Sequence, residues 1–110
     1  MGITNRITWE ALRSIDSATF TGSYQALGTP LVHPSVILKM VNNSNVLVTI
    51  SLDGVTDVDV CPANSFWLYD EDAAGAPAPE AVSADTQVYV KGSAGVGSVY
   101  LVSQYNIRTP

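Results

Sequence analysis

Residues 46–53, Val-Leu-Val-Thr-Ile-Ser-Leu-Asp, form the stretch that most constrains the fold of this chain. Successive side chains of a β-strand point to opposite faces of a sheet. One face would therefore carry Val46, Val48, Ile50 and Leu52. The other face would carry Leu47, Thr49, Ser51 and Asp53. An apolar face opposite a more polar one, with a period of two, predicts a half-buried strand.

Two β-hairpins are predicted around this stretch. The first would join residues 36–41, with Val36, Leu38 and Met40 on one face, to residues 46–53 through the turn-forming residues 42–45. The second would join residues 86–91 to residues 97–105 through the flexible Gly- and Ser-containing segment 92–97.

Two shorter strands follow the first hairpin in the sequence. Over residues 57–60, we expect Val58 and Val60 to point inward and the two aspartates to point outward. Over residues 65–70, Phe66 and Leu68 share the face that resembles core, and Trp67 and Tyr69 share the other face. Residues 71–84 are rich in Pro, Gly and Ala and predict an exposed connection.

The N-terminal part is less regular. Residues 6–15 fit a short helix, with Trp9, Leu12 and Ile15 at helical spacing, and also a strand. We favour an N-terminal arm or edge strand over residues 1–16, followed by a β-sandwich domain over residues 17–110. Short strands around Phe20 and residues 24–27 bring the total to seven to nine, so the predicted fold is an all-β, antiparallel β-sandwich or jelly roll.

The composition excludes several classes of protein. A net charge of −5 with only five Lys and Arg residues gives no basic surface, so we expect no direct nucleic-acid binding. No apolar run approaches the roughly 18 residues of a membrane span. The single cysteine, Cys61, allows neither an intramolecular disulfide nor a multi-cysteine zinc site.

The sequence offers few groups for catalysis. His33 is the only histidine, and no neighbouring sequence supplies a carboxylate to orient it. Cys61 lies in no recognisable nucleophile motif. Asp53, Asp57 and Asp59 could begin a calcium site, although their spacing is not that of an EF-hand, and solvated aspartates at a sheet edge explain them equally well. We expect no enzymatic activity, no metal and no cofactor.

An aromatic surface is the remaining functional signal. Its members are Trp67, Tyr69, Tyr89 and Tyr100. Such rings could stack on sugars, form a subunit interface, or pack under loops as a second layer of the core.

The segments 38–70 and 86–105 resemble small virion proteins of tailed bacteriophages. The resemblance covers about residues 20–105 and rests on the Ser-x-Asp-Gly strand end at residues 51–54, the Pro-Ala-Asn-Ser turn at residues 62–65, and Tyr-Val-Lys-Gly at residues 89–92. It implies a β-sandwich or jelly-roll module that assembles in symmetric copies on a head, neck or tail. It implies no catalytic residue.

The sequence therefore suggests a virion structural protein, assembled in the host cytoplasm, whose partners are further copies of itself and other virion proteins. Capsid decoration and head–tail or tail accessory roles both fit. We expect the subunit contacts to involve Arg6, Trp9, Arg13, Trp67 and Tyr69. The alternative is a carbohydrate-binding or host-attachment module that uses the exposed aromatic side chains.

Overall fold

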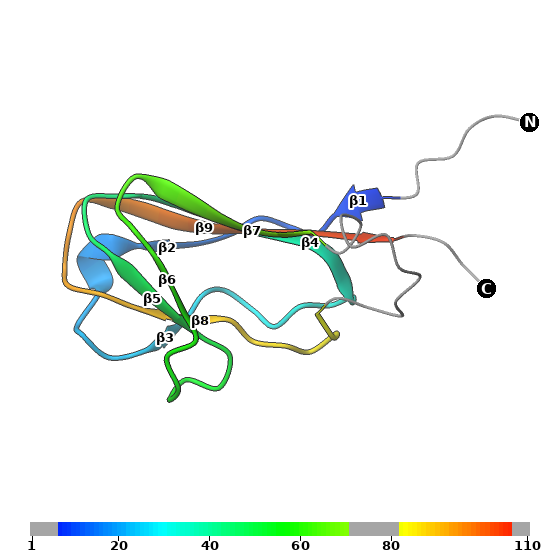
Figure 1. The fold of residues 1–110 in the computed structure, drawn as a ribbon, viewed down its shortest axis with the longest axis horizontal. Helices are drawn as coiled ribbons and strands as arrows, with labels where there is room; N and C mark the ends of the chain where they lie inside the picture. The colour runs from blue at the N-terminus through cyan, green and yellow to red at the C-terminus, as the bar shows by residue number, and fades with distance from the viewer. Residues whose placement is uncertain (1–6, 71–81, 107–110) are drawn as a thin grey trace, which may run out of the picture.

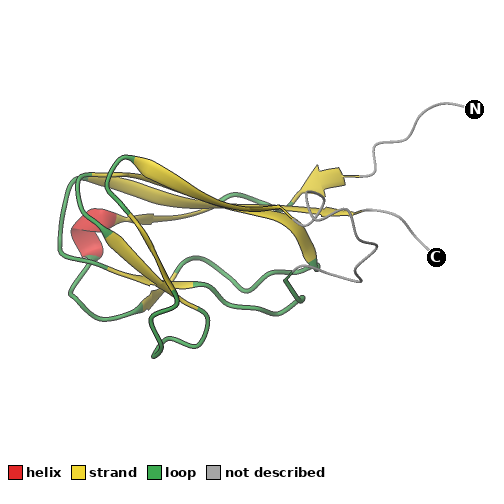
Figure 2. Ribbon diagram, in the orientation of Figure 1, coloured by secondary structure: helices red, strands yellow, loops and turns green. Residues whose placement is uncertain are grey.

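The computed structural model describes residues 7–70 and 82–106, which fold into two antiparallel sheets packed face to face (Figure 1). The elements are β1 (Ile7–Trp9), β2 (Arg13–Asp16), η1 (Ser17–Thr19), β3 (Gln25–Ala26), β4 (Ser35–Ser44), β5 (Val48–Ser51), β6 (Asp59–Cys61), β7 (Ser65–Asp70), β8 (Tyr89–Lys91) and β9 (Gly97–Asn106). Within the described residues the 3-10 turn η1 is the only helical element, and it lies at one end of the two layers (Figure 2). None of the described helical structure is long enough or apolar enough to cross a membrane.

The strand order identifies the sandwich as a jelly roll. One sheet has the order β1-β9-β4-β7, and β2 also pairs with β9. The other sheet has the order β3-β8-β5-β6. If β1 and β2 are counted as one interrupted strand, each sheet has four strands, and the chain crosses to the other sheet at every connection except β5–β6, as in the double Greek key of a jelly roll. The predicted all-β sandwich is confirmed.

The core lies between the two sheets. Its fully buried side chains include Leu38 and Met40 from β4 and Val48 and Ile50 from β5. The inward positions predicted for Leu38, Met40, Val48 and Ile50 are confirmed. Val36 is not part of this core, because the register of β4 shifts between Ser35 and Ile37. β5 ends at Ser51, which is buried, and leaves Leu52 half exposed. Burying each such side chain contributes about 1.5–3 kcal/mol.

Both predicted hairpins are wrong. β4 pairs with β7 and β9, while β5 pairs with β6 and β8, so the two strands of the first hairpin lie in opposite sheets. The strands of the second hairpin, β8 and β9, are separated in the same way. Turn-forming residues indicate where a chain can change direction, but the layer in which it continues depends on distant strands.

The predicted faces of β6 and β7 are also wrong. Val58 and Val60 are 55% and 48% exposed, and Cys61 is the buried residue of β6. In β7, Trp67 packs against the core, whereas Phe66 and Leu68 point away from it. The cause is the register of β7, in which Trp67 lies opposite the inward-facing Met40 of β4.

The N-terminal residues that the structure describes are extended. β1 and β2 run along β9, in line with the edge-strand alternative for this region. Around residues 20–27 the structure forms only the two-residue strand β3. Most of the predicted connection, residues 71–81, lies outside the described residues.

Candidate assembly surface

The strand registers bring apolar side chains together on the outer face of the β1/β2–β9–β4–β7 sheet. Lys39 of β4 lies opposite Val102 of β9 and opposite Leu68 of β7. In the next outward row, Val41 lies opposite Tyr100 and Phe66. Directly opposed side chains are roughly 4.5–5.5 Å apart, so each row forms a continuous strip across the sheet. These six side chains are named the outer rows below.

Large apolar side chains of this face are open to solvent. Phe66 is 63% exposed and Leu68 is 50% exposed. Trp9, opposite Gln104 near the far end of β9, is 62% exposed. A contiguous exposed apolar patch of this kind marks a protein–protein contact or a ligand-binding groove.

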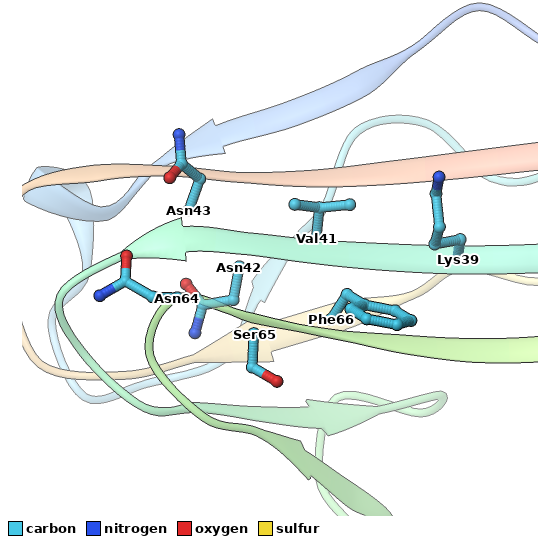
Figure 3. A pocket seen from close by; sticks show the side chains of 7 residues that line it. All are labelled: Lys39, Val41, Asn42, Asn43, Asn64, Ser65 and Phe66. Carbon is cyan, nitrogen blue, oxygen red and sulfur yellow. The ribbon is translucent and has the colours of Figure 1, made fainter.

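A shallow groove crosses the β4–β7 end of the same face (Figure 3). Its volume is about 350 Å³, and its lining residues are Lys39, Val41, Asn42, Asn43, Asn64, Ser65 and Phe66. Among the described residues, the ammonium of Lys39 and the side-chain amides of Asn43 and Asn64 have no hydrogen-bonding or ionic partner. Asn64 has the positive φ of 56° that asparagine tolerates, in the turn between β6 and β7. The groove therefore combines one exposed aromatic ring with three unpaired polar groups.

Asn42 holds the structure beneath this groove. It is fully buried, and its Nδ2 donates to the carbonyls of Val46, Cys61 and Pro62 at 2.9, 3.0 and 3.1 Å. Its Oδ1 accepts from the backbone N–H of Ser44 at 3.2 Å and from the Ser44 hydroxyl at 2.5 Å. The side-chain amide of Asn42 therefore links β4 to the connection between β4 and β5 and to the turn between β6 and β7.

The five residues expected at an interface lie in different places. Arg6 is outside the described residues, and Trp9 is exposed on the outer face. Arg13 is buried. Trp67 packs on the core and its indole N–H donates to Asp59, and Tyr69, on the same side of β7, is 39% exposed.

Phe66 and Leu68 are the exposed residues of β7 that the sequence interpretation assigned to the core. No local signal distinguishes the two faces of this strand, because both carry large apolar side chains. Only pairing with β4, whose inward face is set by Leu38 and Met40, decides which face of β7 meets solvent.

Arg13 is part of a buried polar cluster. Its Nε donates to the carbonyl of Thr29 at 2.7 Å, and its Nη2 donates to the carbonyl of Pro30 at 2.9 Å and to Glu10 Oε1 at 2.8 Å. The Glu10 carboxylate also accepts the backbone N–H groups of Val32 and His33. Burial alone would raise the pKa of Glu10, but these hydrogen bonds outweigh it and lower the pKa below its ordinary value. The cluster fastens the loop after β3 to the break between β1 and β2.

His33 does have a carboxylate partner, contrary to the sequence interpretation. Its Nδ1 lies 3.0 Å from Glu10 Oε2, and its ring stacks on Tyr105 with centroids 3.7 Å apart. Among the described residues, no hydroxyl or thiol is hydrogen-bonded to this ring. Cys61 is fully buried on β6, and burial raises the pKa of its thiol.

The three aspartates considered for calcium have separate partners. Asp53 Oδ1 accepts the backbone N–H groups of Val55 and Thr56 at 2.8 and 2.7 Å, which holds the pKa of Asp53 far below its usual range. Asp57 accepts from the Tyr24 hydroxyl and forms an ion pair with Lys91 at 3.2 Å. Asp59 accepts from the Trp67 indole. In the part of the chain that the structure describes, no group of three or more His, Cys, Asp or Glu side chains could hold a metal ion.

No family model matches the chain, and comparisons with curated proteins and with solved structures return no match. The jelly roll itself is shared by viral capsid, lectin and cupin domains. Fold alone therefore does not select a function, which has to be inferred from the exposed surface.

Proposed function

We propose that this chain is a non-enzymatic structural protein of a bacteriophage virion, and that it assembles in symmetric copies through the outer face of the β1/β2–β9–β4–β7 sheet. The observation that carries the proposal is the exposure of Phe66 and Leu68 in the outer rows, whose other members are Val41, Tyr100, Val102 and the one charged residue, Lys39. The virion assignment is supported by the sequence resemblance and agrees with the jelly-roll topology.

The size of this face suits a subunit contact. Four strands spaced about 4.8 Å apart, with central strands of ten residues, give roughly 500 Å² of flat area. Projecting side chains make the accessible area larger, which brings it near the roughly 800 Å² per partner of a stable interface.

The charge distribution also favours contact between copies. A chain with a net charge of −5 repels its own copies unless the contacting surface is nearly neutral. In the outer rows Lys39 is the only charged residue, so the centre of such a contact would hold no opposing negative charges.

Substitution of Val41 by Lys tests the proposal, because it puts a charge at the centre of the outer rows. We expect the mass measured by light scattering to fall toward that of one chain, and incorporation into particles to be lost. Val55→Lys is the matched control, since Val55 is 79% exposed in the β5–β6 loop, away from this face. Wild-type assembly by Val41→Lys would overturn the proposal, and electron microscopy of intact particles would give the copy number and symmetry axis.

The groove favours a second candidate function, the binding of a saccharide. Trp67 cannot serve as the exposed platform because its ring packs on the core, but the 63% exposed ring of Phe66 can. Asn43 and Asn64 supply amides of the kind that hydrogen-bond sugar hydroxyls. Glycan-array binding that is lost in Asn43→Ala, with the fold retained, would support this function. A wild-type chain that binds no glycan on the array would eliminate it.

A further inference from the structure

The four edges of the two sheets differ in how well they are protected. β3 has two residues and β6 has three, so neither offers a useful length of backbone to another chain. The β1/β2 edge is broken between Trp9 and Arg13. β7 is different, because its six residues run without interruption and contain no Pro, Gly or Lys. Short, broken or charged edges are the usual protection against strand addition, and β7 has none of these features before Asp70 at its end.

β7 also pairs on one side only. Among the described strands its partner is β4, so the backbone groups along its other side have no strand partner. Such an edge is a template for an added antiparallel strand. Its outward side chains, Phe66 and Leu68, are the exposed apolar groups that an added strand would bring together.

We propose that β7 pairs antiparallel with β7 of a second copy of this chain, about a two-fold axis at Trp67. This inference rests on the proposed function, since it names the contact by which two copies begin to assemble. The pair would join the two β1/β2–β9–β4–β7 sheets into one continuous sheet.

The register follows from which side chains point outward. Phe66 and Leu68 must lie opposite outward residues of the second copy, because a slip by one residue would set them against inward-facing residues. Placing Phe66 opposite Phe66 leaves Leu68 opposite Asn64, and placing Leu68 opposite Leu68 leaves Phe66 opposite Asp70. Only the register centred on Trp67 sets each Phe66 opposite a Leu68, twice by symmetry.

This register extends the outer rows across the two copies. The row Tyr100–Val41–Phe66 of one copy would continue into Leu68, Lys39 and Val102 of the other. Each strip therefore doubles in length, and the apolar face available for further assembly doubles with it.

Disulfide cross-linking tests the register directly. Two variants are made in a Cys61→Ala background, one with Phe66→Cys and one with Leu68→Cys. Opposed residues have Cα atoms roughly 4.5–5.5 Å apart, within the range of a disulfide, whereas diagonal neighbours are roughly 7–8 Å apart and outside it. We expect a covalent dimer when the two variants are mixed under a mild oxidant, and none from either variant alone. Failure of the mixture to cross-link, or equal cross-linking of Phe66→Cys with itself, would overturn the inference.

The mass of Leu68→Arg provides a second measurement. In the proposed register each arginine would lie opposite Phe66 of the other copy, where it would place a charge against an apolar ring and should prevent pairing. Val60→Arg, the same kind of change at an exposed position on β6, should leave the mass unchanged. If oligomers persist in Leu68→Arg and no mixed disulfide forms, the β7 contact is wrong while assembly through the outer face stands. If the wild-type chain is monomeric at every concentration and absent from particles, both proposals fail.

Discussion

Replacing Asn42 by Ala should destabilise the fold far more than a surface substitution. The change removes the donor to the carbonyls of Cys61 and Pro62 and the acceptor for the Ser44 N–H, all within or beside the core. A buried polar group that loses its partner costs about 1–3 kcal/mol. The carbonyl of Val46 would still accept a hydrogen bond from the Ser44 hydroxyl at 3.3 Å, so its lost bond to Asn42 adds little to the destabilisation. Because the surrounding structure can relax, we expect the three unpaired groups together to lower the free energy of unfolding by about 3 kcal/mol, which corresponds to a fall of roughly 12 °C or more in Tm.

The assay is urea unfolding followed by circular dichroism, at one protein concentration because assembly would shift the apparent stability. Asn43→Ala is the matched control, since Asn43 is the next residue of the same strand, is exposed, and has no hydrogen-bonding partner among the described residues. Its expected cost is below about 0.5 kcal/mol. Equal unfolding midpoints for the two variants would refute the role assigned to Asn42.

Three further predictions concern other parts of the fold. Because its hydrogen bonds lower the pKa of Glu10 in the folded state, this carboxylate stabilises the fold fully above its ordinary pKa, and the contribution is lost as the pH falls through the lower, folded value. Glu10→Gln should therefore be less stable at pH 7 and show a flatter dependence of unfolding free energy on pH below about 5; an unchanged acid profile would contradict this. Gly97→Ala should cost more than Gly22→Ala in thermal melts, because both glycines have positive φ but a Cβ at residue 97 would lie 2.1 Å from the carbonyl oxygen of residue 43, whereas nothing lies within 4 Å at Gly22. The Cys61 thiol should react with an aromatic disulfide reagent only after unfolding, since it is buried and its pKa is raised, and rapid reaction of the native chain would show that β6 opens.

The local strand pattern was largely readable from the sequence. Apolar side chains at every second position, Leu38 and Met40 in one segment and Val48 and Ile50 in the next, identified two central strands and their inward faces. This is possible because successive side chains of a strand point to opposite faces. The fold class followed from the number of such strands and from the lack of a long helical pattern.

The candidate surface was not readable in the same way. Arg13 resembled an exposed basic residue of an arm, but the carboxylate of Glu10 and the carbonyls of Thr29 and Pro30 make it a buried anchor. These partners come from segments up to 17 residues away, and nothing local identifies them.

The sequence by itself determined that this chain forms short antiparallel strands with two-residue periodicity, because that information resides in neighbouring side chains. The tertiary structure alone decided which strands share a sheet and which face of β7 meets solvent. Phe66 and Trp67 are adjacent, large and apolar, so either could have been buried. The register with β4 decides between them: Trp67 lies opposite Met40, which is buried in the core, so Trp67 faces the core as well.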